Sequence, residues 1–175
     1  MTINGNKRIY YLIPIILFLY VLGLLGCRAT TSIATKINPT YNNKIKRVFV
    51  ISNISSSLGN STAKDFEQSI LSELRSNNIQ ADIATVLELD IDINLYKERL
   101  NEFNPDTILT IKDIGGTKNE RGIIIDVLFD VLLIDKSDII IWRANVKFIK
   151  GDSEKDDGFI LAKDIFGKLK EDGII

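Results

Sequence analysis

Residues 122–149 read GIIIDVLFDVLLIDKSDIIIWRANVKFI, two apolar, β-branched runs joined by the turn-forming tetrapeptide DKSD (135–138). A two-residue turn at Lys136 and Ser137 would place Asp135 opposite Asp138. It would also pair residues on one apolar face: Val131 with Trp142, Phe129 with Ala144, Val127 with Val146 and Ile125 with Phe148. On the other face it would pair Asp130 with Arg143 and Asp126 with Lys147. Both faces agree with one register, so the sequence predicts a long antiparallel hairpin.

Upstream of this hairpin, strand and helix patterns alternate. Strands are predicted at RVFVISNI (47–54), ADIATVLEL (81–89) and DTILTIKDI (106–114). A helix is predicted from Thr62, whose capping box uses Asp65, to residue 76, and another over 94–103 with Leu95, Tyr96, Leu100 and Phe103 inward. The closing helix, within 156–173, directs Phe159, Ala162, Phe166 and Leu169 inward.

The predicted order is therefore β-α-β-α-β-β-β-α. It indicates an α/β (mixed α+β) fold, in which a mixed sheet of about five strands carries helices on its faces. The first three strands are expected to be parallel, because helices connect them. We expect one domain over residues 45–175, large enough to fold without disulfides or metal.

The first 26 residues have the layout of an export signal. Lys7 and Arg8 precede an uncharged apolar run, residues 9–26, that ends in a small residue. Leu24-Leu25-Gly26-Cys27 resembles the lipobox of bacterial lipoproteins. The resemblance implies a diacylglycerol on the Cys27 thiol, cleavage before Cys27, and often acylation of the new amino group. Two alternatives stay open: an uncleaved anchor helix and a secreted form without lipid.

Residues 27–44 are predicted to be the lipidated Cys27 and a flexible tether, because RATTSIATKINPTYNNK (28–44) is small and polar. Such a coil spans roughly 20–25 Å and would hold the domain clear of the lipid headgroups. Arg28 stands where Gram-negative lipoproteins kept on the inner membrane tend to carry Asp. The resemblance therefore implies the outer membrane, facing the periplasm.

The amino-acid composition excludes several classes of function. With 22 Lys and Arg against 23 Asp and Glu, the chain lacks the concentrated positive charge of a nucleic-acid-binding protein. The sequence contains no histidine and one cysteine, which rules out Ser-His and Cys-His catalytic pairs, thiolate zinc sites and internal disulfides. We therefore predict no catalytic, metal or cofactor-binding residues and no cofactor; the only assigned site is the lipid attachment at Cys27.

Four further segments are weaker candidates for a site. The loop SSSLGNS (55–61) lacks the spacing of phosphate-binding motifs. Glu88, Asp90 and Asp92 would share one face of an extended strand and could bind a cation, but they lack the EF-hand pattern. The acidic segment 152–157 is interpreted as a loop with a helix cap, and the glycine connection 114–122, with Lys118, Glu120 and Arg121, as a turn or contact loop.

FNPDTILTI (103–111) and LLIDKSDIIIWRANV (132–146) look like segments of small envelope lipoprotein domains, among them activators of penicillin-binding proteins and the lipoprotein that secretes curli. The resemblance implies a non-catalytic protein-interaction or assembly module. It would be attached to the membrane through lipid on Cys27 and would bind an envelope protein. Two alternatives remain: a subunit of a membrane-inserted secretion or pore assembly that uses hairpin 122–149, and a carboxylate-dependent envelope enzyme.

Overall fold

Six strands form a single sheet in the order β1-β6-β5-β4-β2-β3. The computed structural model describes residues 29–85, 93–151 and 156–175, with side chains in the second range from residue 97. Along the chain the elements are β1 (Thr30–Ile37), β2 (Arg47–Asn53), α2 (Ser55–Leu58), α3 (Asn60–Ser76), β3 (Gln80–Thr85), α4 (Ile93–Phe103), β4 (Thr107–Lys118), β5 (Ile124–Asp135), β6 (Ile140–Ile149) and α5 (Asp157–Glu171). The predicted mixed α/β fold is confirmed, with one strand more than expected.

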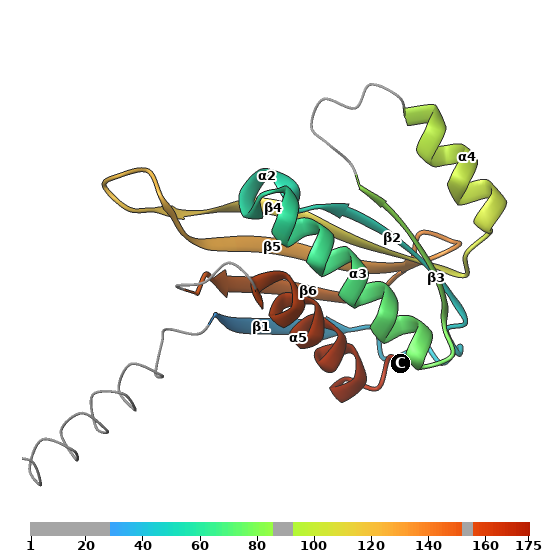
Figure 1. Ribbon diagram of the computed structural model, residues 1–175. Coiled ribbons are helices and arrows are strands. Elements are labelled where there is room, and N and C mark those ends of the chain that lie inside the picture. The colour runs from blue at the N-terminus through green and yellow to red at the C-terminus, as the bar shows by residue number, and fades with distance from the viewer. Residues whose placement is uncertain (1–28, 86–92, 152–155) are drawn as a thin grey trace, which may run out of the picture.

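The sheet is parallel where helices connect its strands and antiparallel elsewhere. β2 pairs in parallel with both β3 and β4, and β4, β5, β6 and β1 pair antiparallel. Helices α3 and α5 lie side by side on one face (Figure 1). Their inward side chains pack against the buried residues of the sheet, which include Val50, Leu109, Phe129, Trp142 and Phe148.

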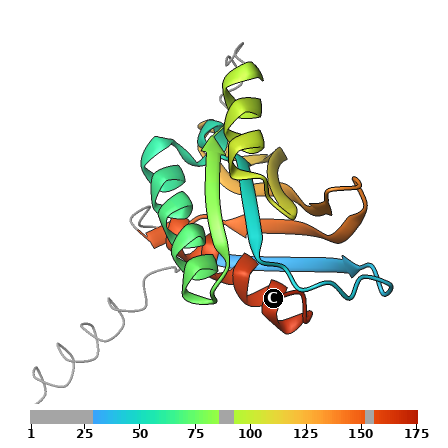
Figure 2. The same ribbon diagram turned by 90° about the vertical axis from the view of Figure 1, so that its right-hand side faces the viewer.

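The second face of the sheet is covered at its β2–β3 end by α4 (Figure 2). The rings of Phe103 and Phe49 lie 5.9 Å apart, and the guanidinium of Arg47 lies 4.9 Å from the centre of the Phe103 ring. Arg99 of α4 forms an ion pair with Asp82 of β3 at 2.9 Å. These contacts bury Phe49 completely, although it points away from α3 and α5.

The expected flexible tether is wrong for residues 30–37. They form β1, an edge strand that pairs along its whole length with β6, from Thr30 opposite Ile149 to Ile37 opposite Trp142. Thr31, Ile33 and Thr35 alternate toward the helical face and are half-buried. The alternation of β-branched residues suits an edge strand, even though its composition resembles that of a linker.

The hairpin exists, but its predicted register is off by two residues. Leu133 pairs with Trp142 and Val131 with Ala144. The cause is the turn: the Asp135 carboxylate accepts hydrogen bonds from the backbone N–H groups of Ser137 and Ile139, and Asp138 adopts a φ of 58°. This is a longer turn with a bulge rather than a two-residue turn. A shift of two keeps each side chain on its predicted face.

Two helix details also differ from the prediction. Helix α3 begins at Asn60 with Gly59 as its N-cap, so Thr62 is a buried helical residue and not the cap. In α5, Ala162, Phe166 and Leu169 are buried as predicted, but Phe159 is 44% exposed. Phe159 follows Gly158, which packs so close to the backbone of α3 that the first turn of α5 directs Phe159 outward.

Candidate functional site

The N-terminal segment enters the domain at one end of the sheet. Ala29 is already buried, at 8% exposure, and β1 begins at the next residue. Thr30 pairs with Ile149, the last residue of β6, which in turn lies opposite Asp126 of β5, and Asp126 lies opposite Thr117 of β4. These four residues form one row across the sheet. We call the part of the domain at and beyond this row the entry end.

The β4–β5 hairpin projects past the row at the entry end (Figure 1). Its base is bent by bulges at Ile114 and at Ile125. The Asp113 carboxylate accepts a hydrogen bond from the N–H of Gly115, whose φ is 131°. Gly116 lies so close to the partner strand that an added Cβ would stand 2.2 Å from the carbonyl oxygen of Asp126. Glycine is therefore required at Gly116.

The hairpin tip repeats the geometry of the β5–β6 turn at the opposite end. The Asn119 side-chain oxygen accepts hydrogen bonds from the N–H groups of Arg121 and Ile123, as Asp135 does from Ser137 and Ile139. Gly122, with a φ of 77°, takes the place of Asp138. The predicted glycine connection is thus an ordered turn, and Lys118, Glu120 and Arg121 are exposed around it.

Exposed apolar side chains gather at the entry end. Nine large apolar residues are exposed in the part of the chain that the structure describes. Three of them, Ile37, Ile139 and Ile140, lie at the opposite end. Five lie on the β4–β5 hairpin or at the end of β6, at or near the entry end: Ile114, Ile123, Ile125, Leu128 and Ile149. Phe159, on α5, lines the groove beside the start of β1. Several exposed apolar groups at one end of a domain commonly mark a contact with protein or membrane.

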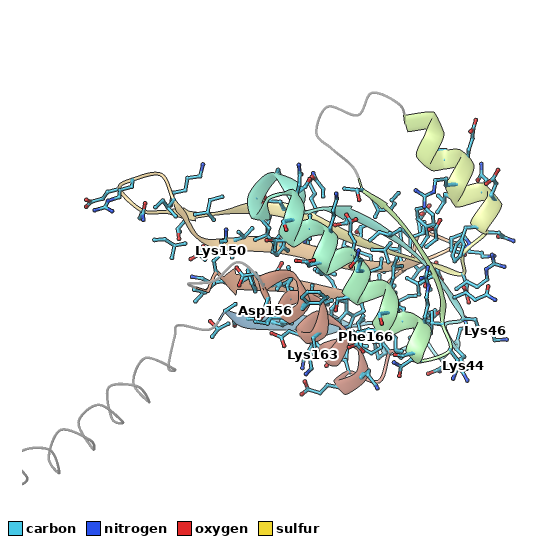
Figure 3. The ribbon with its side chains drawn as sticks, in the orientation of Figure 1. Lys44, Lys46, Lys150, Asp156, Lys163 and Phe166 are labelled. Atoms are coloured by element: carbon cyan, nitrogen blue, oxygen red, sulfur yellow. The ribbon has the colours of Figure 1, made fainter. Side chains whose placement is uncertain are left out.

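Charged groups surround these apolar side chains. Figure 3 shows Lys150 and Asp156 toward the entry end and Lys44 and Lys46 toward the opposite end. The Lys150 backbone N–H donates to the carbonyl of Ile125 at 3.1 Å, which ties the end of β6 to the hairpin. Lys147 forms a 3.1 Å ion pair with Asp126. Hydrogen bonds from Lys147 and Thr117 lower the pKa of Asp126 below its ordinary value.

Two hollows flank the entry end. A cleft of about 280 Å³ lies between α2 and the base of the β4–β5 hairpin and is lined by Ser56, Ser57, Gly116, Lys118 and Asp126 among others. A shallow groove beside the start of β1 is lined by Ala29, Thr30, Phe159, Ile160, Lys163 and others. This groove therefore adjoins the point where the N-terminal segment arrives.

Among the residues that the structure describes, no helix covers the sheet face opposite α3 and α5 over β4, β5 and β6 (Figure 2), and we call this the open face. Its residues are the ones that alternate with the buried core, and they mix half-buried apolar side chains with charges. The guanidinium of Arg143 pairs with both carboxylate oxygens of Asp130, at 2.9 and 3.0 Å. Together Ile108, Leu132 and Ile134 form a half-exposed apolar strip beside this pair.

The side chain of Trp142 anchors the opposite end of α5. Its indole N–H donates to the Asp172 carboxylate at 2.7 Å, and Lys168 lies 3.2 Å from the other oxygen of Asp172. Burial by itself would raise the pKa of Asp172, but hydrogen bonds from Trp142, Thr35 and Lys168 outweigh it and lower that pKa. Asp172 therefore links the core strand β6 to the end of the closing helix.

The candidates predicted from the sequence lie either outside the described residues or in other structures than expected. Cys27, Glu88, Asp90 and Asp92 lie outside the described residues, as does most of the acidic segment 152–157. Residues 55–61, expected to be a loop, form the short helix α2 and the start of α3. Asp157 is buried and accepts a hydrogen bond from the Gly151 N–H at 3.3 Å.

Within the ranges that the structure describes, no group of three or more acidic or cysteine side chains is placed to hold a metal ion. A helix long and apolar enough to cross a bilayer is likewise not found among those residues. The apolar run 9–26 lies outside them.

Hairpin 122–149, the candidate membrane-inserting element, forms the middle of the sheet. β5 lies between β4 and β6, and the inward side chains Val127, Phe129, Val131, Ala144 and Val146 are at most 1% exposed. Moving this hairpin into a bilayer would uncover the apolar faces of α3 and α5. The packing therefore weighs against the pore alternative.

Similar proteins are found among solved structures, whereas no protein-family model and no curated protein sequence matches this chain. The PelC dodecamer from Paraburkholderia phytofirmans is similar at 15% identity and a TM-score of 0.46, covering 80% of this chain and 94% of that one. A variant of the same dodecamer with one leucine replaced by methionine gives 18% identity, a TM-score of 0.48, and 80% and 96% coverage. Lipoprotein GNA1162 from Neisseria meningitidis gives 14% identity, a TM-score of 0.41, and 72% and 99% coverage.

Proposed function

We propose that the chain is a bacterial envelope lipoprotein, held by lipid on Cys27 at the outer membrane and facing the periplasm, that binds a partner protein without catalysing a reaction. The observation that carries this proposal is the position of Ala29. It is buried in the domain two residues after the lipobox cysteine. A folded domain therefore follows the lipidation motif directly, and its free surfaces are presented at the membrane.

The open sheet face supports binding of a protein partner. It combines the apolar strip of Ile108, Leu132 and Ile134 with the Asp130–Arg143 ion pair. Mixed apolar and polar composition, with arginine present, is typical of interfaces between proteins that also exist separately. The ion pair fixes the direction of the guanidinium, so the remaining donor groups of Arg143 are oriented toward a partner.

A non-catalytic role agrees with the residue inventory. The chain has no histidine, and its single cysteine is the predicted lipid site. The usual general base of neutral-pH catalysis and the usual thiol nucleophile are thus missing from the sequence. The carboxylate-dependent enzyme stays an alternative for Glu88, Asp90 and Asp92, which lie outside the described residues.

The anchor is tested by mass spectrometry of the mature N-terminus together with membrane fractionation of cells producing the full chain. We expect a lipid-modified Cys27 as the first residue and recovery in the membrane fraction, and the Cys27→Ser variant is expected to lose the lipid. A mature protein that keeps Met1 or carries an unmodified thiol would contradict the proposal.

Partner binding is tested by placing a photo-crosslinking amino acid at Asn145, an exposed residue on the open face, in living cells. The matched control carries the same amino acid at Gln68, which is exposed on α3 on the other side of the molecule. We expect a discrete protein adduct from position 145 that position 68 does not give. Equal labelling at both positions, or none at either, would refute the assignment of this face.

A further inference from the structure

The sheet register sets the height of the lipid site relative to the β4–β5 hairpin. Thr30, Ile149, Asp126 and Thr117 share one row across the sheet. Cys27 lies three residues before Thr30 in the sequence, so it reaches at most about 10 Å beyond the row. The tip residues Glu120 and Arg121 lie three and four residues past Thr117. At about 3.3 Å per residue, they extend roughly 10–13 Å beyond the same row.

The lipid site can therefore lie no further out than about the height of the hairpin tip, at the same end of the sheet. Three strand spacings separate β1 from β4 in the sheet order. This corresponds to about 14 Å across the sheet. The polar headgroup layer of a bilayer leaflet is about 5–7 Å thick. If Cys27 lies at the base of that layer, the row stands at most about 10 Å above it, so a hairpin tip that extends roughly 10–13 Å beyond the row still reaches the layer.

The hairpin tip has the chemistry of a membrane-surface contact. Ile123 and Ile125, which lie beyond the row, are 58% and 46% exposed, and Ile125 is a bulged residue that the strand pairing leaves outside the ladder. Lys118 and Arg121 flank them and are exposed. Apolar side chains that enter the boundary of the acyl chains, beside basic side chains at the headgroups, are typical of interfacial membrane binding.

We propose that the tip of the β4–β5 hairpin, residues 118–123 with Ile125, is a second membrane contact that rests on the bilayer surface beside the lipid anchor. This proposal depends on the proposed function, because the lipid on Cys27 brings the hairpin to the membrane. Together, the two contacts fix the orientation of the domain: the sheet stands on its entry end, and the open face of β4, β5 and β6 is turned sideways toward the envelope space.

The test compares two substitutions in turns of the same construction. Ile123→Trp places a fluorophore at the hairpin tip, and Ile139→Trp places it at the equivalent position of the β5–β6 turn, at the opposite end, where Ile139 is 49% exposed. The native Trp142 is fully buried and gives a constant background. The full-length lipidated protein is reconstituted in vesicles whose lipids carry bromine near the top of the acyl chain.

We expect the fluorescence of Ile123→Trp to be quenched by the brominated lipids, and that of Ile139→Trp to stay at the wild-type level. Equal quenching of both variants, or of neither, would overturn the proposal. Because a substitution could perturb the hairpin, trypsin treatment of wild-type vesicles gives a second measurement. We expect trypsin to cleave after Lys136 and to leave Arg121 protected. Cleavage after Arg121 that is faster than cleavage after Lys136 would contradict the proposal.

Membrane fractionation of the same preparations separates the two levels of inference. If the protein floats with the vesicles and Ile123→Trp is not quenched, the hairpin contact is wrong and the lipid anchor stands. If the protein does not float and Cys27 is unmodified, the proposed function itself fails, and the hairpin contact fails with it.

Discussion

At the scale of single residues, Trp142 shows how one side chain joins two distant parts of the chain. Its indole N–H donates to Asp172, thirty residues further on. Replacing Trp142 with Phe removes a hydrogen bond to a charged group and leaves a small cavity in the core, so we expect a loss of about 3 kcal/mol in the free energy of unfolding. Urea unfolding followed by circular dichroism measures it. A loss below about 1 kcal/mol would show that the link is unimportant.

The same carboxylate predicts a dependence on pH. The pKa of Asp172 is lower in the folded protein than its ordinary value, because hydrogen bonds from Trp142, Thr35 and Lys168 outweigh burial. The stabilisation is therefore complete above the unfolded pKa of about 3.9 and is lost as pH falls through the lower folded value. We expect Asp172→Asn to flatten the decline of the urea midpoint below about pH 4.

The matched control for this prediction is Glu171→Gln. Glu171 also pairs with Lys168, at 3.1 Å, but it is 71% exposed. An exposed ion pair of this kind contributes little to the free energy of unfolding. The urea midpoint of the control is therefore expected to fall at acid pH as that of the wild type does. If both variants behave alike, Asp172 has no special role. The sequence suggested the burial of Trp142 through the hairpin pattern, but it carried no signal for Asp172 as partner, because helix-end contacts depend on tertiary packing.

At the scale of elements, the backbones of α5 and α3 come into close contact at Gly158. A Cβ at Gly158 would stand 2.3 Å from the carbonyl oxygen of Thr62 and 2.7 Å from the backbone nitrogen of Phe66. We expect Gly158→Ala to destabilise the protein by about 1–3 kcal/mol, since the backbones of the two helices must separate. Thermal unfolding measures the change.

Gly167 of the same helix is the control, because an added Cβ there would meet no atom within 4 Å. Gly167→Ala should stabilise the protein by about 0.5–1 kcal/mol, as expected for alanine in place of glycine inside a helix. Destabilisation by both substitutions to the same extent would contradict the idea that close packing at Gly158 matters.

The elements also show what sequence reasoning can and cannot recover. The strands with continuous apolar runs, β2, β4, β5 and β6, were predicted because burial dominates their composition. β1 was missed because Thr30–Ile37 contains few large apolar residues, and the alternation of Thr31, Ile33 and Thr35 was its only signal. The hairpin register was missed because the Asp135 side chain, and not the number of turn residues, sets the turn geometry.

At the scale of the whole molecule, β1 shortens the connection between the domain and the proposed lipid site. A tether of residues 28–44 would hold the domain roughly 20–25 Å from the lipid and leave its orientation free. With β1 paired to β6 from Thr30 onward, only Arg28 and Ala29 separate the proposed lipid site Cys27 from the sheet. The proposed anchor and hairpin contact would then set the orientation together.

Inserting a flexible Gly-Ser linker of about 16 residues between Arg28 and Ala29 tests this directly, since it restores a span of about 20–24 Å. In the Ile123→Trp background we expect the linker to reduce quenching by brominated lipids toward the level of Ile139→Trp, while the protein still floats with the vesicles. The reason is that the lipid alone retains the protein, whereas the short connection presses the hairpin tip onto the surface. Thermal unfolding of the inserted variant controls for the integrity of β1. Unchanged quenching in a folded, membrane-bound variant would mean that the short connection does not impose the hairpin's contact, and the entry end would then have to bind lipid by its own affinity.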